Sequence, residues 1–448
     1  MKSYERGHRQ SRRESRCPKE WNAIVSHIST THVVVVGAGP YGLSLGAHLH
    51  HARVPFRIFG EPMKTWATQM PVGMKLKSDG FASNLSSGGV PFTLEDWCLI
   101  NQKPYHATLV PVAVEDFVAY GREFQQRFVP NLEKQDVALV EREGDRFRVT
   151  LEDGQQVLAR HVVLATGVSL FQYVPPMLRR LPAGSVSHSS DHQTFQQFAG
   201  KHVTVIGRGA SSLNAAVLLK EEGGEATVLA RSRKLHVHVL ENPEERPLLQ
   251  KLMHPMSPLG PGMRSWLSCR LPQIFRVLPA GLRRVLTYKH LGPAGGAALQ
   301  GRFDGLDIRM GWSLASAQAI TGPTGDTLVL KLVSAQGEEQ TLETSHIIAG
   351  TGYRVDLTRL KFLSDALTAR IRLQKPSAPR LTANFESSVP RLYFVGPTSA
   401  AAFGPLQRFV AGNEYAAMRV TRHLQADFRR LAHRATETAA TPTAQPAR

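Results

Sequence analysis

The chain has little cysteine: only Cys17, Cys98 and Cys269 occur in 448 residues. No two of them form a CxxC pair, which excludes a reductase that works through two neighbouring redox cysteines. Three scattered cysteines also give neither a disulfide framework nor the spacing of metal ligands. We therefore expect a protein of the reducing cytoplasm that has no metal site.

Long hydrophobic runs and acidic residues are also scarce. The apolar run Val33–Val36 is far too short to span a bilayer, and no apolar segment follows Arg12-Arg13 as in a signal sequence. With 54 Lys and Arg against 36 Asp and Glu, the formal net charge is +18. The basic residues gather in the N-terminal arm, at 231–234 and at 264–289, and no basic stripe interleaved with aromatics appears outside these stretches. We expect no nucleic-acid or membrane partner, and an attraction for phosphate-bearing cofactors or acidic substrates.

A strand, a glycine turn, a helix and a second strand follow one another near the N-terminus. The β-branched run 31–36 predicts a buried parallel strand, and a helix over 43–50 and a strand over 54–59 come later. Between the first strand and the helix lies a GxGxxG turn, which in this context binds the pyrophosphate of a dinucleotide. We assign it to FAD, with Gly37, Gly39, Pro40, Tyr41 and Gly42 as cofactor-binding residues.

The ribose partner of the first turn is displaced. An acidic residue normally ends the second strand, but Gly60 stands at that position and Glu61 follows it. Either Glu61 or a backbone group binds the ribose.

The same order of elements recurs later in the chain. A strand over 202–206 precedes Gly207-Arg208-Gly209-Ala210-Ser211-Ser212, a helix over 213–222 and a strand over 226–230. We assign this turn to a nicotinamide dinucleotide, bound by Gly207, Gly209, Ser211 and Ser212. The last strand is followed by Arg231 and Arg233 rather than an acid, which favours the 2′-phosphate of NADPH over NADH.

Two such repeats predict an α/β fold with two Rossmann-like dinucleotide-binding domains, the NADPH domain being inserted into a split FAD domain. We expect a flexible basic arm over 1–30, the first part of the FAD domain over 31–200 and the NADPH domain over 201–345. The second part of the FAD domain, with the C-terminal helix, covers 346–432, and a disordered tail covers 433–448. A Pro- and Gly-rich excursion over 240–310 is expected to cover the active site.

From His32 to Leu431 the chain resembles flavin-dependent monooxygenases of the two-dinucleotide-domain type. That group includes the flavin-containing monooxygenases, the ornithine and lysine N-hydroxylases, and the FAD-dependent urate hydroxylase-like proteins. Besides the two turns, three stretches are similar: Ala165-Thr166-Gly167, Gly350-Thr351-Gly352-Tyr353 and Leu392-Tyr393-Phe394-Val395-Gly396. The resemblance implies that Thr166, Gly167, Gly352 and Gly396 lie at the cofactors. The family pattern is incomplete around His188, and the substrate segment of the ornithine hydroxylases has no match near Cys269.

The resemblance also implies a mechanism, in which NADPH reduces FAD, molecular oxygen forms a flavin peroxide, and this peroxide oxygenates a small nucleophilic substrate. A nitrogen-containing molecule, urate-like or amino-acid-like, is expected. Trp66 stands where these enzymes place a tryptophan against the flavin, and the segment 75–85 is closest to the urate hydroxylase-like proteins. We expect catalytic roles near the flavin for Lys77, Ser78 and Asn84.

The late Gly404-Pro405-Leu406 is expected to open the last helix, so that its first amides, with Leu406, face the flavin. Two alternatives remain open. The chain could be an FAD-dependent NAD(P)H oxidoreductase that passes electrons to a quinone or a protein, or a non-enzymatic nucleotide- or RNA-binding protein.

Overall fold

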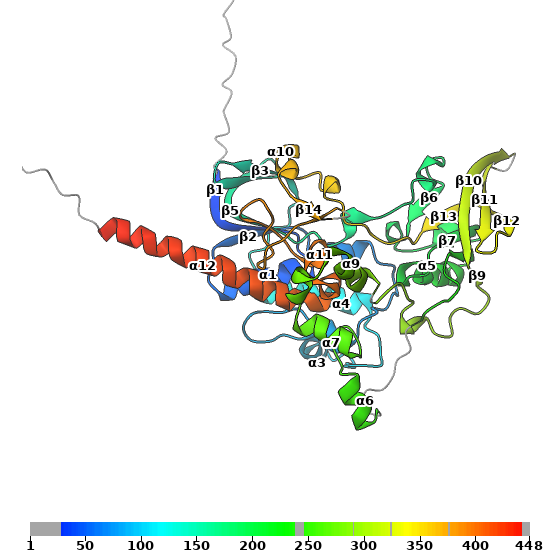
Figure 1. Cartoon of the computed structure of the whole chain (residues 1–448), viewed down its shortest axis with the longest axis horizontal. Helices are drawn as coiled ribbons and strands as arrows, with labels where there is room; N and C mark the ends of the chain where they lie inside the picture. Colours follow the sequence, from blue (N-terminus) through cyan, green and yellow to red (C-terminus); the bar gives the residue numbers. More distant parts are fainter. Residues whose placement is uncertain (1–27, 238–245, 290, 323–324, 375–376, 441–448) are drawn as a thin grey trace, which may run out of the picture.

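The computed structural model describes residues 28–237, 246–289, 291–322, 325–374 and 377–440. The predicted basic arm, 1–30, lies almost wholly outside these residues. Figure 1 shows two sheets side by side, with the long helix α12 (Asn413–Ala440) extending from the body on the side of the first sheet.

The first sheet has six strands and contains the first glycine turn. Its order is β2-β1-β5-β4-β3, and β16 pairs with β5. The strands are β1 (Ser29–Val36), β2 (Phe56–Phe59), β3 (Val137–Glu143), β4 (Arg146–Leu151), β5 (Gln156–Leu164) and β16 (Leu392–Phe394). β2, β1, β5 and β16 run parallel, whereas β4 is antiparallel to both β3 and β5. Since β16 comes after the second sheet in the chain, the first sheet is assembled from two distant segments.

The second sheet has five strands, all in parallel pairs, in the order β6-β13-β7-β8-β9. They are β6 (Val186–His188), β7 (His202–Ile206), β8 (Glu225–Ala230), β9 (Asp307–Met310) and β13 (His346–Ala349). An antiparallel sheet of β10 (Trp312–Gly322), β11 (Gly325–Ser334) and β12 (Glu339–Thr344) lies beside it, and β14 (Leu373–Gln374) pairs with β15 (Ala378–Pro379).

Helices cover both sheets, as the alternating sequence pattern predicts. The first sheet packs with α1 (Pro40–His51), α4 (Val114–Phe128) and α12, and the second with α5 (Ala210–Glu221). The run Val33–Val36 is buried in the core that the first sheet shares with these helices. Shorter helices are α2 (Lys64–Thr68), α3 (Leu94–Ile100), α10 (Asp365–Ala369) and α11 (Ala400–Phe403).

Four α-helices lie in the described part of the excursion between β8 and β9. They are α6 (Leu248–Met253), α7 (Met263–Arg270), α8 (Ile274–Val277) and α9 (Ala280–Tyr288). α8 and α9 lie against α11, so this segment of the second glycine-turn unit returns to pack on the first.

Two predictions about the C-terminus are wrong. The last helix begins at Asn413 rather than at Leu406, because two 3-10 turns, Pro405–Arg408 and Val410–Gly412, are separated by an extended Phe409. The helix then continues to Ala440 and so passes the predicted start of a disordered tail at 433. An alanine-rich end with high helix propensity extends a helix that is already formed. The other domain bounds remain predictions.

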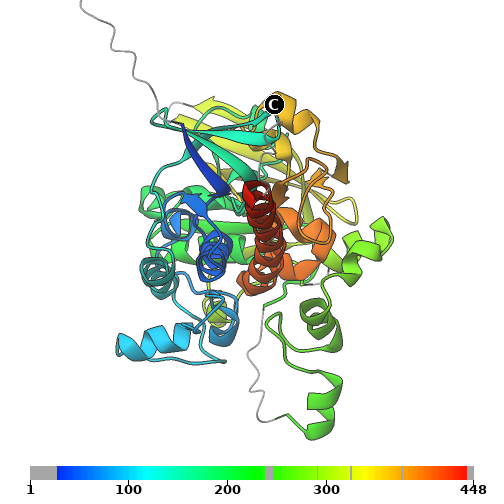
Figure 2. The same cartoon turned by 90° about the vertical axis from the view of Figure 1, so that its left-hand side faces the viewer.

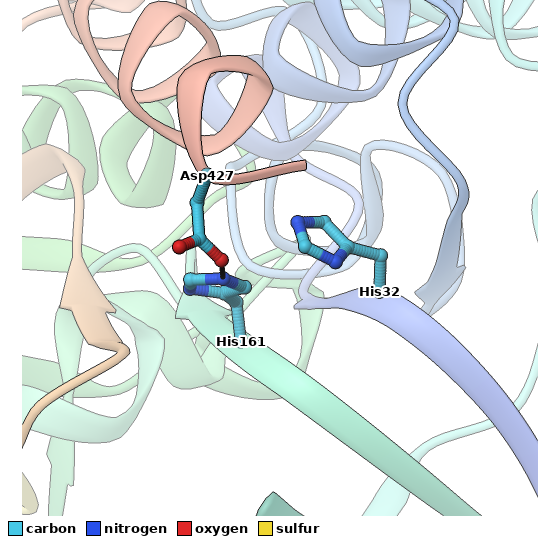
Figure 3. Close-up of side chains that lie close together, drawn as sticks. All are labelled: His32, His161 and Asp427. Atoms are coloured by element: carbon cyan, nitrogen blue, oxygen red, sulfur yellow. Dashed lines mark hydrogen bonds and ion pairs between the residues drawn. The ribbon is translucent and has the colours of Figure 1, made fainter. Parts of the chain in front are cut away.

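A buried polar cluster fastens α12 to the first sheet (Figure 3). His161 Nε2 and Asp427 Oδ2 lie 2.9 Å apart, and Arg160 Nε donates to the same carboxylate oxygen at 2.9 Å. The Tyr393 hydroxyl lies 3.3 Å from His161 Nδ1, and the His32 ring stands 4.8 Å from the His161 ring. Arg160 neutralises Asp427, so the cluster forms a hydrogen-bonded clasp between β5, β16 and the C-terminal helix.

Candidate functional site

The first glycine turn has the backbone conformation that a phosphate-binding turn requires. Gly37 has a φ of +108°, and a Cβ on it would lie 2.6 Å from the Ala165 carbonyl oxygen. A Cβ on Gly42 would lie 1.8 Å from the Gly37 oxygen, whereas one on Gly39 would have no protein atom within 4 Å. The two outer glycines therefore allow close packing, and Gly39 leaves open space where a ligand can approach the backbone.

Three parallel strands end at this turn. The Ala165 amide donates to the Val36 carbonyl at 2.8 Å, and the Val395 amide donates to the Leu164 carbonyl at 3.1 Å. Thr166, Gly167 and Gly396 consequently lie beside the Gly37 turn, at the carboxyl ends of β5 and β16.

The Thr166 hydroxyl is buried and has no hydrogen-bond partner among the described residues. Gly167 resembles Gly39, since a Cβ on it would also have no protein atom within 4 Å. An unpaired buried hydroxyl and two open glycines fit a dinucleotide, which would supply the missing polar partner.

Tyr41, which the sequence predicts at the cofactor, is buried between the first glycine turn and the segment 396–412. Its hydroxyl donates to the Phe409 carbonyl at 2.8 Å, and burial raises its pKa well above the ordinary value. A Cβ on Gly396 would lie 3.2 Å from its ring, and one on Gly412 would lie 2.3 Å from its hydroxyl. Pro40 opens α1, where its missing N–H costs nothing.

Glu61 lies just past the end of β2, as the spacing predicts. Its carboxylate stands 3.6 Å from Lys134 Nζ, and both side chains are partly exposed. The Gly60 amide donates to the Glu133 carbonyl at 3.1 Å. Glu61 is thus placed beyond the turn, with a weak surface ion pair that a ribose could replace.

The second glycine turn repeats the construction of the first. A Cβ on Gly207 would lie 2.3 Å from the Gly350 oxygen, as one on Gly37 would approach Ala165. Ser212 replaces the third glycine, and its hydroxyl donates to the Gly350 carbonyl at 2.8 Å. This hydrogen bond gives the serine a structural role. Gly209 and the exposed Ser211 remain at the start of α5, where amides face outward.

Arg231 and Arg233 follow β8 and are exposed. The Gly311 amide donates to the carbonyls of Ala230 and Ser232, which holds the backbone of this turn. Because both guanidinium groups are already exposed, they can bind a 2′-phosphate without first moving out of the protein interior.

The two segments of the chain that cross between the sheets, around Tyr173 and around Gly352, hydrogen-bond to each other. The Tyr173 amide donates to the Gly352 carbonyl at 2.9 Å, and the Arg354 amide donates to the Phe171 carbonyl at 2.8 Å. His188 also approaches the Gly352 carbonyl, through Nε2 at 3.1 Å. Gly352 is therefore placed at the crossing between the two sites rather than inside either glycine turn.

The residues predicted as catalytic lie on the 75–85 segment, and Ser78 and Asn84 bond to other residues in or next to that segment. The Ser78 and Ser83 hydroxyls lie 2.9 Å apart. Asn84 Oδ1 accepts from the Leu94 amide at 2.8 Å, and its Nδ2 donates to the Phe81 carbonyl at 3.2 Å. These bonds hold the turn before α3, and the catalytic roles of Ser78 and Asn84 remain predictions.

Lys77 and Trp66 have different surroundings. Desolvation, followed by the positive charge of Arg408, lowers the pKa of Lys77. A lysine in such surroundings is a candidate to bind an anion. Trp66 is partly buried and packs edge-on against Phe117, with ring centroids 4.8 Å apart. Its place beside the flavin remains a prediction.

The excursion contacts segments on either side of β16, mainly through residues that the sequence did not single out. Gln273 Nε2 donates to the Ala383 carbonyl at 3.2 Å, and Arg408 Nη1 donates to the Thr287 carbonyl at 2.9 Å. A Cβ on Gly404 would lie 2.6 Å from the Phe275 ring. These long-range contacts have no local sequence signal, apart from the density of Pro and Gly that indicated an excursion.

A groove of about 530 Å³ lies beside this region, lined by the 81–93 loop, the end of α1 and the first turns of α12. Asn84 lines it, and Asn413 Nδ2 donates to the Asn84 carbonyl at 2.8 Å. Leu406 is buried and does not line the groove. No helix among the described residues is both long enough and apolar enough to cross a membrane.

Residues 34–253 match the family described as pyridine nucleotide-disulphide oxidoreductase. The chain is 28% identical to the indole-3-pyruvate monooxygenase YUCCA1 of Oryza sativa subsp. japonica, over 74% of this chain and 79% of the relative. It is 26% identical to the ferredoxin–NADP reductase of Thermus thermophilus, over 46% of this chain and 55% of the relative.

Among solved structures, the ornithine N-hydroxylase of Kutzneria sp. 744, which contains reduced FAD, NADP+ and L-ornithine, has a TM-score of 0.67. Its identity is 15%, and the match covers 89% of this chain and 99% of that one. The matches confirm the predicted fold class and the predicted relationship to flavin-dependent monooxygenases. The family match and the curated relatives also support the prediction of an oxidoreductase.

Proposed function

We propose that this protein is an NADPH- and oxygen-dependent flavin monooxygenase that acts on a small nucleophilic, nitrogen-containing molecule. FAD at the Gly37 turn would supply the redox chemistry, accepting hydride from NADPH and reducing oxygen. The protein would hold the pyrophosphate at Gly39 and Gly167, and the nicotinamide dinucleotide at Gly207 and Arg231.

The observation that carries this proposal is the cover over the FAD part of the molecule. Phe275, Gln273 and Thr287 of the excursion pack on the segment 383–415, beside the turn that contacts Tyr41. Oxygen chemistry at a flavin needs a site from which water is kept out, and such a cover provides it. A reductase that delivers electrons to a large partner needs an open approach instead.

Cysteine chemistry gains no support from the site. Cys98 is a free buried thiol on α3, and Cys269 is a free, half-buried thiol on α7. Burial raises the pKa of both thiols, which disfavours the reactive thiolate form.

The test is a balance of NADPH, oxygen and product. Purified protein would be screened with urate, ornithine, lysine, aspartate and indole-3-pyruvate under labelled oxygen. A monooxygenase incorporates one labelled oxygen atom per NADPH consumed, with little hydrogen peroxide. If every candidate gives hydrogen peroxide alone, the proposal is contradicted.

The second candidate is an electron-transferring NAD(P)H oxidoreductase, which the likeness to ferredoxin–NADP reductase favours. That likeness covers a smaller part of the chain than the monooxygenase match. Anaerobic NADPH oxidation that depends on added ferredoxin or a quinone would establish the second function in place of the first.

A further inference from the structure

The excursion has an unusual charge distribution. From Arg246 to Phe303 the sequence contains nine Lys and Arg residues and no Asp or Glu. The exposed basic side chains in this stretch are Lys251, Arg264, Arg270, Arg284 and Lys289. The acidic residues that precede Arg246 lie outside the described residues. The stretch from Arg246 to Phe303 therefore carries an excess of positive charge.

The same segment exposes many apolar side chains. Of the 23 large hydrophobic side chains exposed among the described residues, 12 lie between Leu248 and Tyr288. On α6 the exposed fractions are high: Leu248 80%, Leu249 70%, Leu252 75% and Met253 60%. Apolar surface of this extent is costly in water and marks a binding surface rather than a solvated one.

The apolar residues also follow helical faces. Met263, Leu267 and Leu271 are spaced by four residues along α7 and its end, and all three are exposed. Figure 2 shows the green helices of the excursion along one edge of the molecule, and in Figure 1 α6 lies below the body, as the lowest of these helices. We call the exposed basic and apolar side chains of 246–289 the basic–apolar face.

We propose that the basic–apolar face docks the protein on the surface of an anionic lipid membrane. Apolar side chains beside Lys and Arg, without acidic residues, are the composition of helices that lie in the membrane interface. The lack of a spanning helix does not bear on such a contact, because a surface helix inserts only one face. The expectation of no membrane partner rested on spanning segments alone.

A second copy of this chain fits the face poorly. In a symmetric dimer the same patch would meet itself, and the positive charges of both copies would be brought together. Like charges across an interface oppose association, whereas an anionic headgroup layer neutralises them. Charge complementarity thus selects the lipid surface as the occupant.

The experiment is sedimentation of the full-length flavoprotein with vesicles of phosphatidylcholine, with and without about one third phosphatidylglycerol. We expect binding to the anionic vesicles to be at least about tenfold tighter than to the neutral ones, and to weaken as salt is raised. The double variant Leu248→Gln/Leu252→Gln should lower the affinity by at least about tenfold. These side chains are exposed, so the variant should fold and keep its flavin.

A matched control is Leu99→Gln/Ile100→Gln on α3, which removes exposed apolar residues elsewhere and should change vesicle binding by less than about twofold. Arg264→Gln/Arg284→Gln should reduce binding to anionic vesicles and flatten its salt dependence. No binding, equal binding to neutral vesicles, or an equal loss in the control would overturn the proposal. So would a dimer in sedimentation velocity that Leu248→Gln/Leu252→Gln converts to monomer.

Discussion

The Tyr41 hydroxyl donates a hydrogen bond of 2.8 Å to the Phe409 carbonyl, and so joins the first glycine turn to the segment before α12. The two residues are 368 positions apart in the chain. Because Gly396 packs on the ring of Tyr41 and Gly412 packs on its hydroxyl, Tyr41 sets the spacing between the Gly37 turn and both late segments.

Tyr41→Phe removes this hydrogen bond while keeping the ring. The Phe409 carbonyl then loses its partner, and we expect a loss of about 1–2 kcal/mol in the free energy of unfolding. FAD should also be retained less well on dilution. Urea unfolding and the flavin absorbance after gel filtration measure the two effects. Tyr105→Phe, which alters a tyrosine away from the turn, is the control, and an equal loss there would contradict the role given to Tyr41.

Gly39→Ala tests the first turn as a cofactor site. A Cβ there meets no protein atom within 4 Å, so the variant should unfold at close to the wild-type temperature. The methyl group would occupy the space assigned to the pyrophosphate, and we expect FAD affinity to fall by at least about tenfold. Bound flavin per chain is the measurement.

Gly281→Ala on α9, where a Cβ also meets open space, serves as its control and should keep full flavin content. Gly37→Ala should behave differently from both, because its Cβ would clash with Ala165 and its φ is positive. It should lower the stability of the fold itself. A Gly39→Ala protein with normal flavin content would place the cofactor elsewhere.

Arg231→Gln tests the preference for NADPH. If Arg231 binds the 2′-phosphate, the KM for NADPH should rise by about tenfold while the KM for NADH stays within about twofold. Steady-state rates of flavin reduction with each nucleotide give both values. Lys201→Gln, exposed at the opposite end of the same sheet, should alter neither. An equal rise in the KM for NADPH and the KM for NADH would show that Arg231 does not bind the 2′-phosphate.

Stability should fall with acid through the clasp on α12. Burial, the largest cause, lowers the pKa of His161 to about 4 from an ordinary 6.5, so the folded protein holds this imidazole neutral. Between these values the unfolded chain binds more protons, and unfolding is favoured as pH falls. The contribution of His161 is roughly 3 kcal/mol at most. It is present above pH 6.5 and is lost by about pH 4.

Asp427 affects stability at a lower pH than His161 does. Burial raises the pKa of its carboxyl, but the hydrogen bonds to Arg160 and His161 outweigh burial and lower this pKa to about 2. Urea unfolding measured from pH 7 to pH 4 tests the histidine effect. His161→Asn should be less stable at pH 7 and should show a shallower decline with acid. An unchanged slope would assign the acid sensitivity to other buried histidines, of which His48 and His346 also have pKa values near 4.

The sequence by itself determined the two strand–turn–helix units. Gly37, Gly42 and Gly207 are required by local backbone geometry, and the β-branched run before Gly37 requires a strand buried on both faces. Such features depend on neighbours within a few residues, so a linear pattern reveals them. The absence of a cysteine pair likewise needed no structure.

Only the tertiary structure decided which distant segments meet. It joined Tyr41 to Phe409, brought Phe275 onto Gly404, and used the Asn84 side chain to hold a turn. It also began α12 at Asn413 rather than at Leu406, and it left the apolar side chains of α6 exposed. The apolar periodicity of a helix predicts that one of its faces is buried or bound, but it does not predict which segment or molecule covers that face. That segment is selected by packing between residues hundreds of positions apart, which leaves no local sequence pattern.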